Sequence, residues 1–309
     1  MSSKSNKKIG KMTLVLLVTI TLAVVAFSGC TEQTDASNIT IKGSSTVLPI
    51  AETAAEQFMA ENSDVKVSVS GGGSSVGIKS VLSGEVDIGD ASRNAKESDV
   101  KNEDGTYKYQ HDDGTDITMD DLVDHVVAYD GIAVVVSPAI KTSITGITMD
   151  QLYMIYTGEI SNWNELGGPD EEIFVNDRAS SSGTRASFVE LIENSSGNAL
   201  EDFEEDGGDL AVDKVNQENS DVVLSVSEAD NAIGYVGLGY VDDETCPSIA
   251  IDGVIPSVDT VKDGSYSISR SLHMYTVGQP TGKVKEFLDY VKGTEGQEIV
   301  EDEGFIPII

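Results

Sequence analysis

The sequence predicts an α/β protein of two doubly wound lobes that are joined by two long crossing strands. One observation behind this is an alternation of short β-branched runs with helical patterns, which is typical of a largely parallel sheet. The other is a pair of β-like runs, at residues 125–136 and 266–277, that are longer than most strands. Runs of this length can pass from one lobe to the other and back, so we expect a cleft between two lobes.

The alternation begins with a strand over residues 39–41. In the helix that follows, over residues 47–59, apolar side chains repeat with a helical period. Residues 101–121 interrupt the alternation with a Gly- and Asp-rich stretch, which we interpret as a surface excursion. The other expected elements are strands at 65–69, 86–88 and 173–175, helices at 78–82, 148–156, 185–193 and 283–292, and further ordered runs near 222–226 and 233–241.

The first 30 residues indicate where the protein is located. Four lysines precede an uncharged apolar run at residues 14–27, which is short for a membrane-spanning helix. This arrangement resembles a lipoprotein signal, which implies that Cys30 becomes the lipid-modified first residue of the mature chain. An uncleaved N-terminal anchor is the alternative. In both cases we expect the rest of the chain to lie outside the cytoplasm, attached to the cell membrane.

The expected domain boundaries follow from these patterns. A signal peptide covers residues 1–29, and a polar tether covers residues 30–37. Lobe I is expected to contain residues 38–127 and 266–309, and lobe II residues 128–265.

Composition argues against several classes of function. Without the four lysines of the signal segment, 16 basic residues stand against 53 acidic ones, a formal net charge of −37. This charge repels nucleic acid, and no basic patch is present to bind it. Cys246 has no partner once Cys30 is lipidated, and the sequence has no Cys/His cluster, so we expect no disulfide, metal site or cofactor. Any anion site must use short-range donors against the field of the whole chain.

Three strand-to-helix junctions are rich in Ser, Thr and Gly, at residues 43–46, 71–75 and 180–184. A helix N-terminus presents unpaired N–H groups and a partial positive charge, and both favour an anion. Hydroxyl groups add neutral donors, and glycine lets the backbone approach a ligand closely. Helix capping alone explains a single junction of this kind. Three of them, from both expected lobes, indicate an anion site in the cleft.

Two arginines flank the third junction. Arg178 precedes the hydroxyl-rich turn and Arg185 follows it. A guanidinium group forms forked, charge-assisted hydrogen bonds to a tetrahedral oxyanion, so we expect Arg178 to be a ligand. We interpret Arg185 as a surface residue in the first turn of the next helix.

Six segments of the chain resemble the phosphate-binding proteins of ABC phosphate importers. They lie in order between residues 39 and 309, and they are IKGSSTVLP, GGGSSVGIK, VDIGDASR, TMDQLYMIYTGEISNW, NDRASSSGTRASF and DGVIP. The resemblance implies a type II periplasmic-binding-protein fold that closes on one dehydrated phosphate. It implies a solute-binding protein and not an enzyme, with inorganic phosphate and the permease subunits of an importer as partners. We expect the protein to be a monomer.

The resemblance also implies which residues bind phosphate. They are Thr46 and the Val47 amide from the first junction, Ser74 from the second, and Arg178, Ser182, the Gly183 amide and Thr184 from the third. Ser45 and Ser75, the neighbouring hydroxyl residues, are further candidates.

One position departs from the family pattern. Bacterial members carry a carboxylate after the third strand that accepts the proton of hydrogen phosphate, and Ser92 occupies that place here, followed by Arg93. A hydroxyl group can either donate or accept, so the discrimination of phosphate from sulfate stays open. Asp90 is the nearest carboxylate. Arg93 is a further candidate ligand that could share the role of Arg178.

Other functions fit parts of the pattern. Residues 73–77 match the G-x-S-x-G motif of serine hydrolases, with Ser75 as the nucleophile and His273 as the best-placed base. However, His273 is expected in the middle of a strand, which argues against this hypothesis. A binder of sulfate, molybdate or tungstate, or a lobe that serves a sensor, would need the same fold.

Overall fold

The computed structural model describes residues 37–309. The expected signal peptide, the lipidation site Cys30 and most of the expected tether lie outside the described residues. None of the helices within residues 37–309 combines the length and hydrophobicity needed to cross a membrane.

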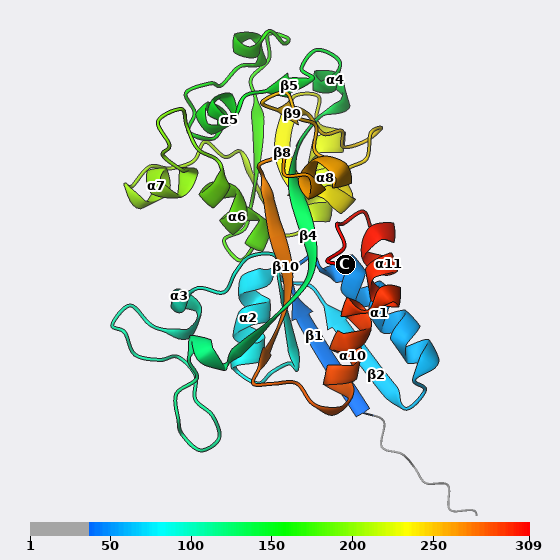
Figure 1. Ribbon diagram of the computed structural model, residues 1–309. Coiled ribbons are helices and arrows are strands. Elements are labelled where there is room, and N and C mark those ends of the chain that lie inside the picture. Colours follow the sequence, from blue (N-terminus) through cyan, green and yellow to red (C-terminus); the bar gives the residue numbers. More distant parts are fainter. Residues whose placement is uncertain (1–36) are drawn as a thin grey trace, which may run out of the picture. The chain divides into compact units, whose positions relative to one another are not determined.

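A mixed sheet of eight strands runs through the described part of the chain, in the order β2-β1-β3-β10-β4-β8-β6-β7 (Figure 1). Two further short strands, β5 and β9, pair with each other. The strands are β1 (Ser37–Gly43), β2 (Val65–Ser70), β3 (Ile88–Ala91), β4 (Leu122–Val136), β5 (Gly146–Ile147), β6 (Phe174–Arg178), β7 (Lys214–Asn216), β8 (Ala232–Gly237), β9 (Ala250–Ile251) and β10 (Ser269–Val277).

Strands β4 and β10 connect two groups of parallel strands. Strands β2, β1 and β3 are parallel in one group, and β8, β6 and β7 are parallel in the other. Between them β10 and β4 are antiparallel to each other and to their outer neighbours. Residues 122–131 of β4 pair with β10, and residues 132–136 pair with β8, so β4 belongs to both groups (Figure 1). The predicted α/β architecture with two crossing strands is confirmed.

Helices cover both faces of each group of strands. They are α1 (Leu48–Glu61), α2 (Ser74–Leu82), α3 (Glu97–Val100), α4 (Pro138–Lys141), α5 (Met149–Tyr156), α6 (Gly183–Leu191), α7 (Leu200–Glu205), α8 (Asn219–Glu228), α9 (Val258–Lys262), α10 (Gly282–Lys292) and α11 (Thr294–Asp302). Short 3₁₀ turns occur at Met119–Asp121, Trp163–Leu166 and Leu238–Tyr240.

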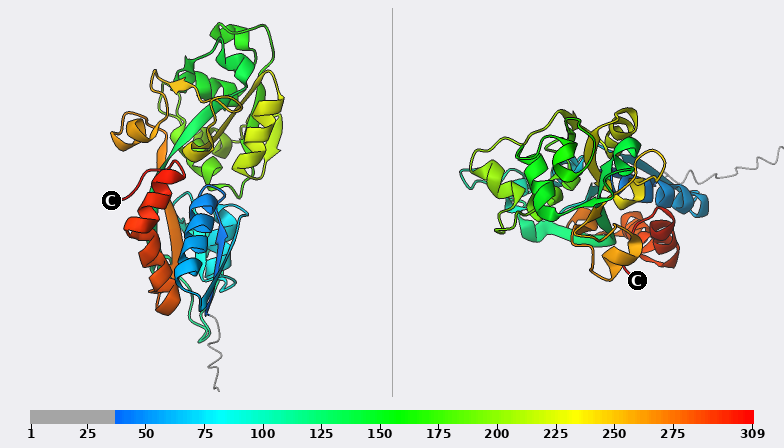
Figure 2. Two further views of the ribbon diagram at one scale, coloured as in Figure 1. Left: turned by 90° about the vertical axis from the view of Figure 1, so that its right-hand side faces the viewer. Right: turned by 90° about the horizontal axis from the view of Figure 1, so that it is seen from above.

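The apolar core is divided between the two groups. In lobe I, α1, α10 and α11 pack side by side on one face of the strands (Figure 2), where the rings of Phe58 and Phe287 meet edge to face at 5.4 Å. In lobe II, the largest cluster surrounds Trp163, which is fully buried. Burying aromatic side chains of this size supplies much of the stability of each lobe.

Each crossing segment of the chain contributes side chains to both hydrophobic clusters, and the change from one cluster to the other takes only a few residues. Ala128 and Leu272 pack in the lobe I cluster, whereas Ile132 and Ile268 pack in the lobe II cluster. These memberships support lobe boundaries within residues 128–132 and 268–272, a few residues after the expected ones. The boundaries themselves remain a proposal.

Some elements differ from expectation. Helix α11 was not predicted, because its sequence contains Gly296 and few strongly apolar residues. Strand β10 begins at Ser269, three residues later than expected, and Tyr266 instead packs in the lobe II core and donates its hydroxyl to the Ile132 carbonyl at 2.8 Å. The excursion contains two short turns, in which Asp104 accepts hydrogen bonds from Thr106 and Asp113 accepts them from Thr115.

Candidate anion-binding site

Three helix N-termini meet beside the crossing strands. Helix α1 follows β1, α2 follows β2 and α6 follows β6, which are the three hydroxyl-rich junctions of the sequence (Figure 1). Gly43 and Gly73 have φ values of 149° and 91°, a region that favours glycine, so both junctions need a residue without a side chain there. The junctions before α2 and α6 are in contact, because the Ser75 amide donates to the Ser181 carbonyl at 3.1 Å.

The first junction is held by hydroxyl groups. Ser44, which was not among the predicted residues, accepts hydrogen bonds from the amides of Thr46 at 3.1 Å and Val47 at 3.4 Å. The Ser45 hydroxyl accepts from Arg178 Nη2 at 3.1 Å, and the Ser45 carbonyl accepts from the Tyr240 hydroxyl at 2.6 Å. The loop before α1 is therefore fixed to lobe II as well as to lobe I.

Hydroxyl groups of the first and third junctions are in contact. Thr46 Oγ1 and Thr184 Oγ1 lie 3.1 Å apart, and both side chains are buried. Asn219, at the start of α8, donates its amide to Ser45 Oγ at 3.2 Å and to Thr46 Oγ1 at 3.1 Å. Two threonine hydroxyls this close can donate to a single oxyanion, and they come from different lobes.

Arg178 is a buried cation whose hydrogen-bond acceptors are all neutral. It ends β6 and donates to Asn219 Oδ1 at 2.7 Å, to the Gln217 carbonyl at 2.8 Å and to Ser45 Oγ. Its Nε is buried without a partner, and within residues 37–309 no carboxylate lies within ion-pair distance of its guanidinium group. Burial lowers the pKa of Arg178, while the charge of Glu218, which lies beyond ion-pair distance, acts in the opposite direction. A buried cation without an ion-pair partner favours an anion beside it.

A carboxylate fixes the backbone around Arg178 without neutralising its side chain. Asp177 accepts the Arg178 amide at 2.8 Å, and it also accepts the Tyr235 hydroxyl. Arg185 donates its Nε to Asp177 at 2.9 Å and pairs with Glu204. Arg185 lies in the first turn of α6, as expected, but its side chain is only 19% exposed and its charge is paired with two carboxylates.

Two serine side chains of lobe I pack against the first residue of α6. Ser74 and Ser92 are both buried, the Ser92 amide donates to Ser74 Oγ at 2.9 Å, and their hydroxyl oxygens are 3.3 Å apart. Gly183 packs directly on them: a Cβ added there would lie 2.1 Å from Ser74 Oγ. Only glycine fits at this contact between the lobes.

Three other predicted residues take part in structural hydrogen bonds. The Ser182 hydroxyl accepts from the Arg185 amide at 3.2 Å as the N-cap of α6. The Ser75 hydroxyl accepts from Arg93 Nη2 at 3.1 Å, and Arg93 is held by two hydrogen bonds of 2.8 and 2.9 Å to Asp99. The charge of Arg93 is thus paired, unlike that of Arg178. The ligand roles of all eleven residues stay predictions.

Asp90 lies in β3 opposite Gly43 and Met274 and is almost completely buried. Neither of its carboxylate oxygens has a hydrogen-bond partner among the described residues. Burial raises the pKa of Asp90 well above its ordinary value. No hydrogen bond joins Asp90 to Arg178 or to the threonines, so within the described residues its carboxylate is not part of the network at the junctions.

Sequence reasoning missed two charged residues at the site, Arg270 on β10 and Asp130 on β4. They form a buried ion pair of 2.8 Å, and Arg270 also donates to Thr46 and Thr184. A signal was available. Each is a charged residue inside an apolar β-run, and charged residues are rarely buried unless they have a partner.

The geometry does not favour the hydrolase hypothesis. The Ser75 hydroxyl accepts from an arginine, and His273 Nδ1 lies 2.8 Å from Asp124 Oδ1. Among residues 37–309, no histidine lies within hydrogen-bond distance of Ser75, so a base is not in place. The same residues contain no group of three or more His, Cys, Asp or Glu side chains that could hold a metal ion.

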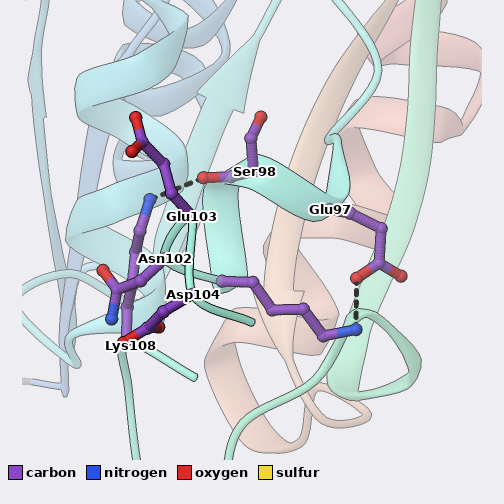
Figure 3. A pocket seen from close by; sticks show the side chains of 7 residues that line it. Glu97, Ser98, Asn102, Glu103, Asp104 and Lys108 are labelled. Atoms are coloured by element: carbon purple, nitrogen blue, oxygen red, sulfur yellow. Dashed lines mark hydrogen bonds and ion pairs between the residues drawn. The ribbon is translucent and has the colours of Figure 1, made fainter. Parts of the chain in front are cut away.

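A surface cavity of about 880 Å³ lies around α3 and the start of the excursion (Figure 3), and none of the residues that line it belongs to the three junctions. Its lysines are satisfied locally, since Lys101 pairs with Glu97 at 2.8 Å and Lys108 donates to the Ser98 carbonyl at 2.6 Å. Lys108 is exposed and Lys101 is partly exposed, so neither offers a desolvated donor to an anion.

The chain is similar to known phosphate-binding proteins along most of its length. The profile of the PBP superfamily domain matches residues 28–295. The phosphate-binding protein PstS of Bacillus subtilis is 36% identical, across 97% of this chain and 95% of its own length. PstS of Borreliella burgdorferi is 30% identical, across 96% of this chain and 99% of its own length.

Solved structures give the same result. A putative phosphate ABC transporter substrate-binding protein from Clostridium perfringens, with bound phosphate, superposes with a TM-score of 0.74 at 31% identity, and covers 88% of this chain and 100% of its own. An ABC-type phosphate transport receptor from Vibrio cholerae has a TM-score of 0.64 at 28% identity, and covers 87% of this chain and 99% of its own.

Proposed function

Because the chain belongs to the PstS family of phosphate-binding proteins within the PBP superfamily, we propose that it captures inorganic phosphate and delivers it to the permease of an ABC-type importer. It acts by binding, and its role in transport needs no chemical step.

The observation that carries this proposal is the uncompensated charge of Arg178 beside the hydroxyl groups of Ser45, Thr46 and Thr184. Hydroxyl and amide donors together with one forked cation suit a tetrahedral oxyanion that has lost its water. They supply short-range attraction, which is required in a chain whose net charge repels anions.

Ligand binding would favour the closed arrangement of the lobes. A phosphate that accepts hydrogen bonds from Thr46 and Thr184 contacts lobe I and lobe II at once. Its affinity for the closed state therefore exceeds that for an open state, and the difference in affinity drives closure.

The location of the protein follows from the same assignment. We infer that it functions on the extracytoplasmic face of the cell membrane, as a monomer anchored by a lipid on Cys30. Labelling of cells with a clickable fatty acid should mark the parent and not the Cys30→Ser variant, which should be released into the medium. Release of the parent to the same extent would contradict the anchor.

Calorimetric titration with phosphate, sulfate and molybdate tests the proposed ligand. We expect one phosphate per chain and the tightest binding for phosphate. Small-angle scattering should show compaction at saturation. Heat with sulfate or molybdate but none with phosphate would reject the assignment.

Another tetrahedral oxyanion is the second candidate, and Ser92 is the observation that favours it. The resemblance to the family implies a proton-accepting carboxylate at this position, whereas Ser92 has a hydroxyl, and a hydroxyl does not exclude sulfate. The same titration separates the two candidates.

A further inference from the structure

Arg270 and Asp130 form an ion pair at the point where the crossing strands pass between the lobes. They are cross-strand partners on β10 and β4. Arg270 donates to Asp130 Oδ2 from Nε at 3.1 Å and from Nη2 at 2.8 Å, and the side chains are 4% and 0% exposed. Asp130 Oδ1 accepts the Leu238 amide at 2.9 Å, so the carboxylate is held from both sides.

The guanidinium group of Arg270 touches the hydroxyl groups of both lobes. Its Nη2 lies 3.2 Å from Thr46 Oγ1 and 3.0 Å from Thr184 Oγ1. These are the two hydroxyls, 3.1 Å apart, that come from the junctions before α1 and α6. An oxyanion that accepts from both hydroxyls would therefore be next to Arg270.

The ion pair with Asp130 does not use all the hydrogen-bond donors of Arg270. Arg270 Nη1 is buried and has no hydrogen-bond partner among the described residues. Hydrogen bonds link Arg270 to Arg178, because Arg270 and Asn219 both donate to Thr46 Oγ1, and Arg178 donates to Asn219 Oδ1. Among the described residues, Asp130 is the one carboxylate within ion-pair distance of either guanidinium group. Two buried guanidinium groups with one ion-paired carboxylate and free donors favour an anion as the missing partner.

We propose that Arg270 is a second cationic ligand of the bound oxyanion, supplied by a crossing strand and oriented by Asp130. The inference rests on the proposed function and names a residue that the three hydroxyl-rich junctions do not contain. Thr46, Thr184 and Arg270 come from the two lobes and the connection between them. Their contacts with one anion would form together when the lobes close.

Because Arg270→Gln alone would leave Asp130 buried without a counter-ion, the test uses the neutral pair Asp130→Asn/Arg270→Gln. Two amides can hydrogen bond to each other, so the strand contact is kept while the charge is removed. The matched control is Asp124→Asn/His273→Gln, which replaces another carboxylate and its hydrogen-bonded partner on the same two strands, 2.8 Å apart, with two amides. Among the described residues, neither side chain hydrogen bonds to Thr46, Thr184 or Arg178. Circular dichroism and melting temperature establish folding of both variants.

The parent is titrated with phosphate first, because that result decides the proposed function independently. We expect the Asp130→Asn/Arg270→Gln protein to bind phosphate at least about 30-fold more weakly than the parent, as is typical when a buried charge partner is lost. The control should bind within about threefold of the parent, within 1 kcal/mol. Parent-like binding by a folded Asp130→Asn/Arg270→Gln protein would overturn the role of Arg270.

A second measurement does not depend on any variant that could fail to fold. In ¹⁵N side-chain spectra of the parent, saturation with phosphate should shift the Arg270 Nη signals and slow the exchange of their protons with water. An Arg270 that only neutralises Asp130 would show the same signals with and without phosphate, and that result would also overturn the proposal.

Discussion

Replacing Gly183 with alanine should weaken phosphate binding and leave the protein folded. Gly183 is the first residue of α6 and its φ is not positive, so alanine suits the helix better than glycine by up to about 1 kcal/mol. A Cβ at this position would lie 2.1 Å from Ser74 Oγ and 2.7 Å from Ser92 Oγ. Both serines belong to lobe I, so the overlap exists only while the lobes are closed.

The size of the effect follows from that overlap. A separation of 2.1 Å is far below the 3.4–4 Å of an ordinary contact. Rotation of the Ser74 hydroxyl would not remove the overlap, because Ser74 Cβ itself would lie 2.8 Å from the added Cβ. Overpacking of this kind costs about 1–3 kcal/mol. If the cost falls on the closed state alone, it lowers the affinity for phosphate by roughly 5- to 160-fold.

Calorimetry and thermal denaturation of the parent, Gly183→Ala and Gly71→Ala would test this reasoning. Gly71 also precedes a helix and its φ is not positive, but an added Cβ there would lie 3.5 Å from its nearest neighbouring atom, Glu218 Oε1, which is an ordinary contact. We expect the Gly71 variant to bind phosphate like the parent, and the Gly183 variant to keep the parent's melting temperature. Unchanged affinity in Gly183→Ala would refute the closure argument, and so would a large loss of thermal stability in the absence of ligand.

Three further predictions concern charge. Without the signal lysines the net charge is −37, so moderate salt should speed phosphate association in stopped-flow experiments, because screening weakens the repulsion. A steady fall in on-rate from low to moderate salt would contradict this. Asn219→Asp should place a carboxylate beside Arg178, and this internal anion would compete with the ligand. Calorimetry should show phosphate binding weakened at least about tenfold, whereas equal affinity would argue against Arg178 as a ligand. Burial raises the pKa of Asp90, so the folded state binds this proton more tightly than the unfolded chain does. The free energy of unfolding therefore falls as pH rises from the ordinary Asp pKa towards the raised one, by up to about 1.4 kcal/mol per pH unit. Denaturant unfolding should show that Asp90→Asn stabilises the protein more at pH 8 than at pH 5, and a larger gain at pH 5 would contradict the assignment.

Local patterns in the sequence were enough to predict the architecture. The alternation of β-branched runs and helices, and the two unusually long runs that became β4 and β10, are visible over short windows. The hydroxyl-rich junctions were recognisable for the same reason, since each combines a strand end and a helix start within a few residues. Helix α11 was missed because its apolar face is small and includes Gly296.

Long-range contacts could not be predicted in this way. Arg270 is separated from Thr46 by 224 residues, and nothing near either residue indicates that they meet. Arg178 and Arg185 also differ in their ion-pair partners, which the sequence does not show. Both flank the same junction, but Arg185 pairs with two carboxylates and Arg178 with none among residues 37–309. A charge pattern shows that an arginine is present, whereas only the fold shows whether its charge is already compensated.

The affinity of Arg178→Ala for phosphate, relative to that of the parent, tests the central claim most directly. Removal of the guanidinium group would leave a desolvated anion held largely by neutral donors, and we expect a loss of about 2–5 kcal/mol, or roughly 30-fold to several-thousand-fold in Kd. Arg178→Lys should recover part of it, because an ammonium group cannot form the forked contact. Arg93→Ala, which removes an arginine already paired with Asp99, should cost less affinity. A folded Arg178→Ala protein that binds phosphate within about threefold of the parent, under 1 kcal/mol, would contradict the account.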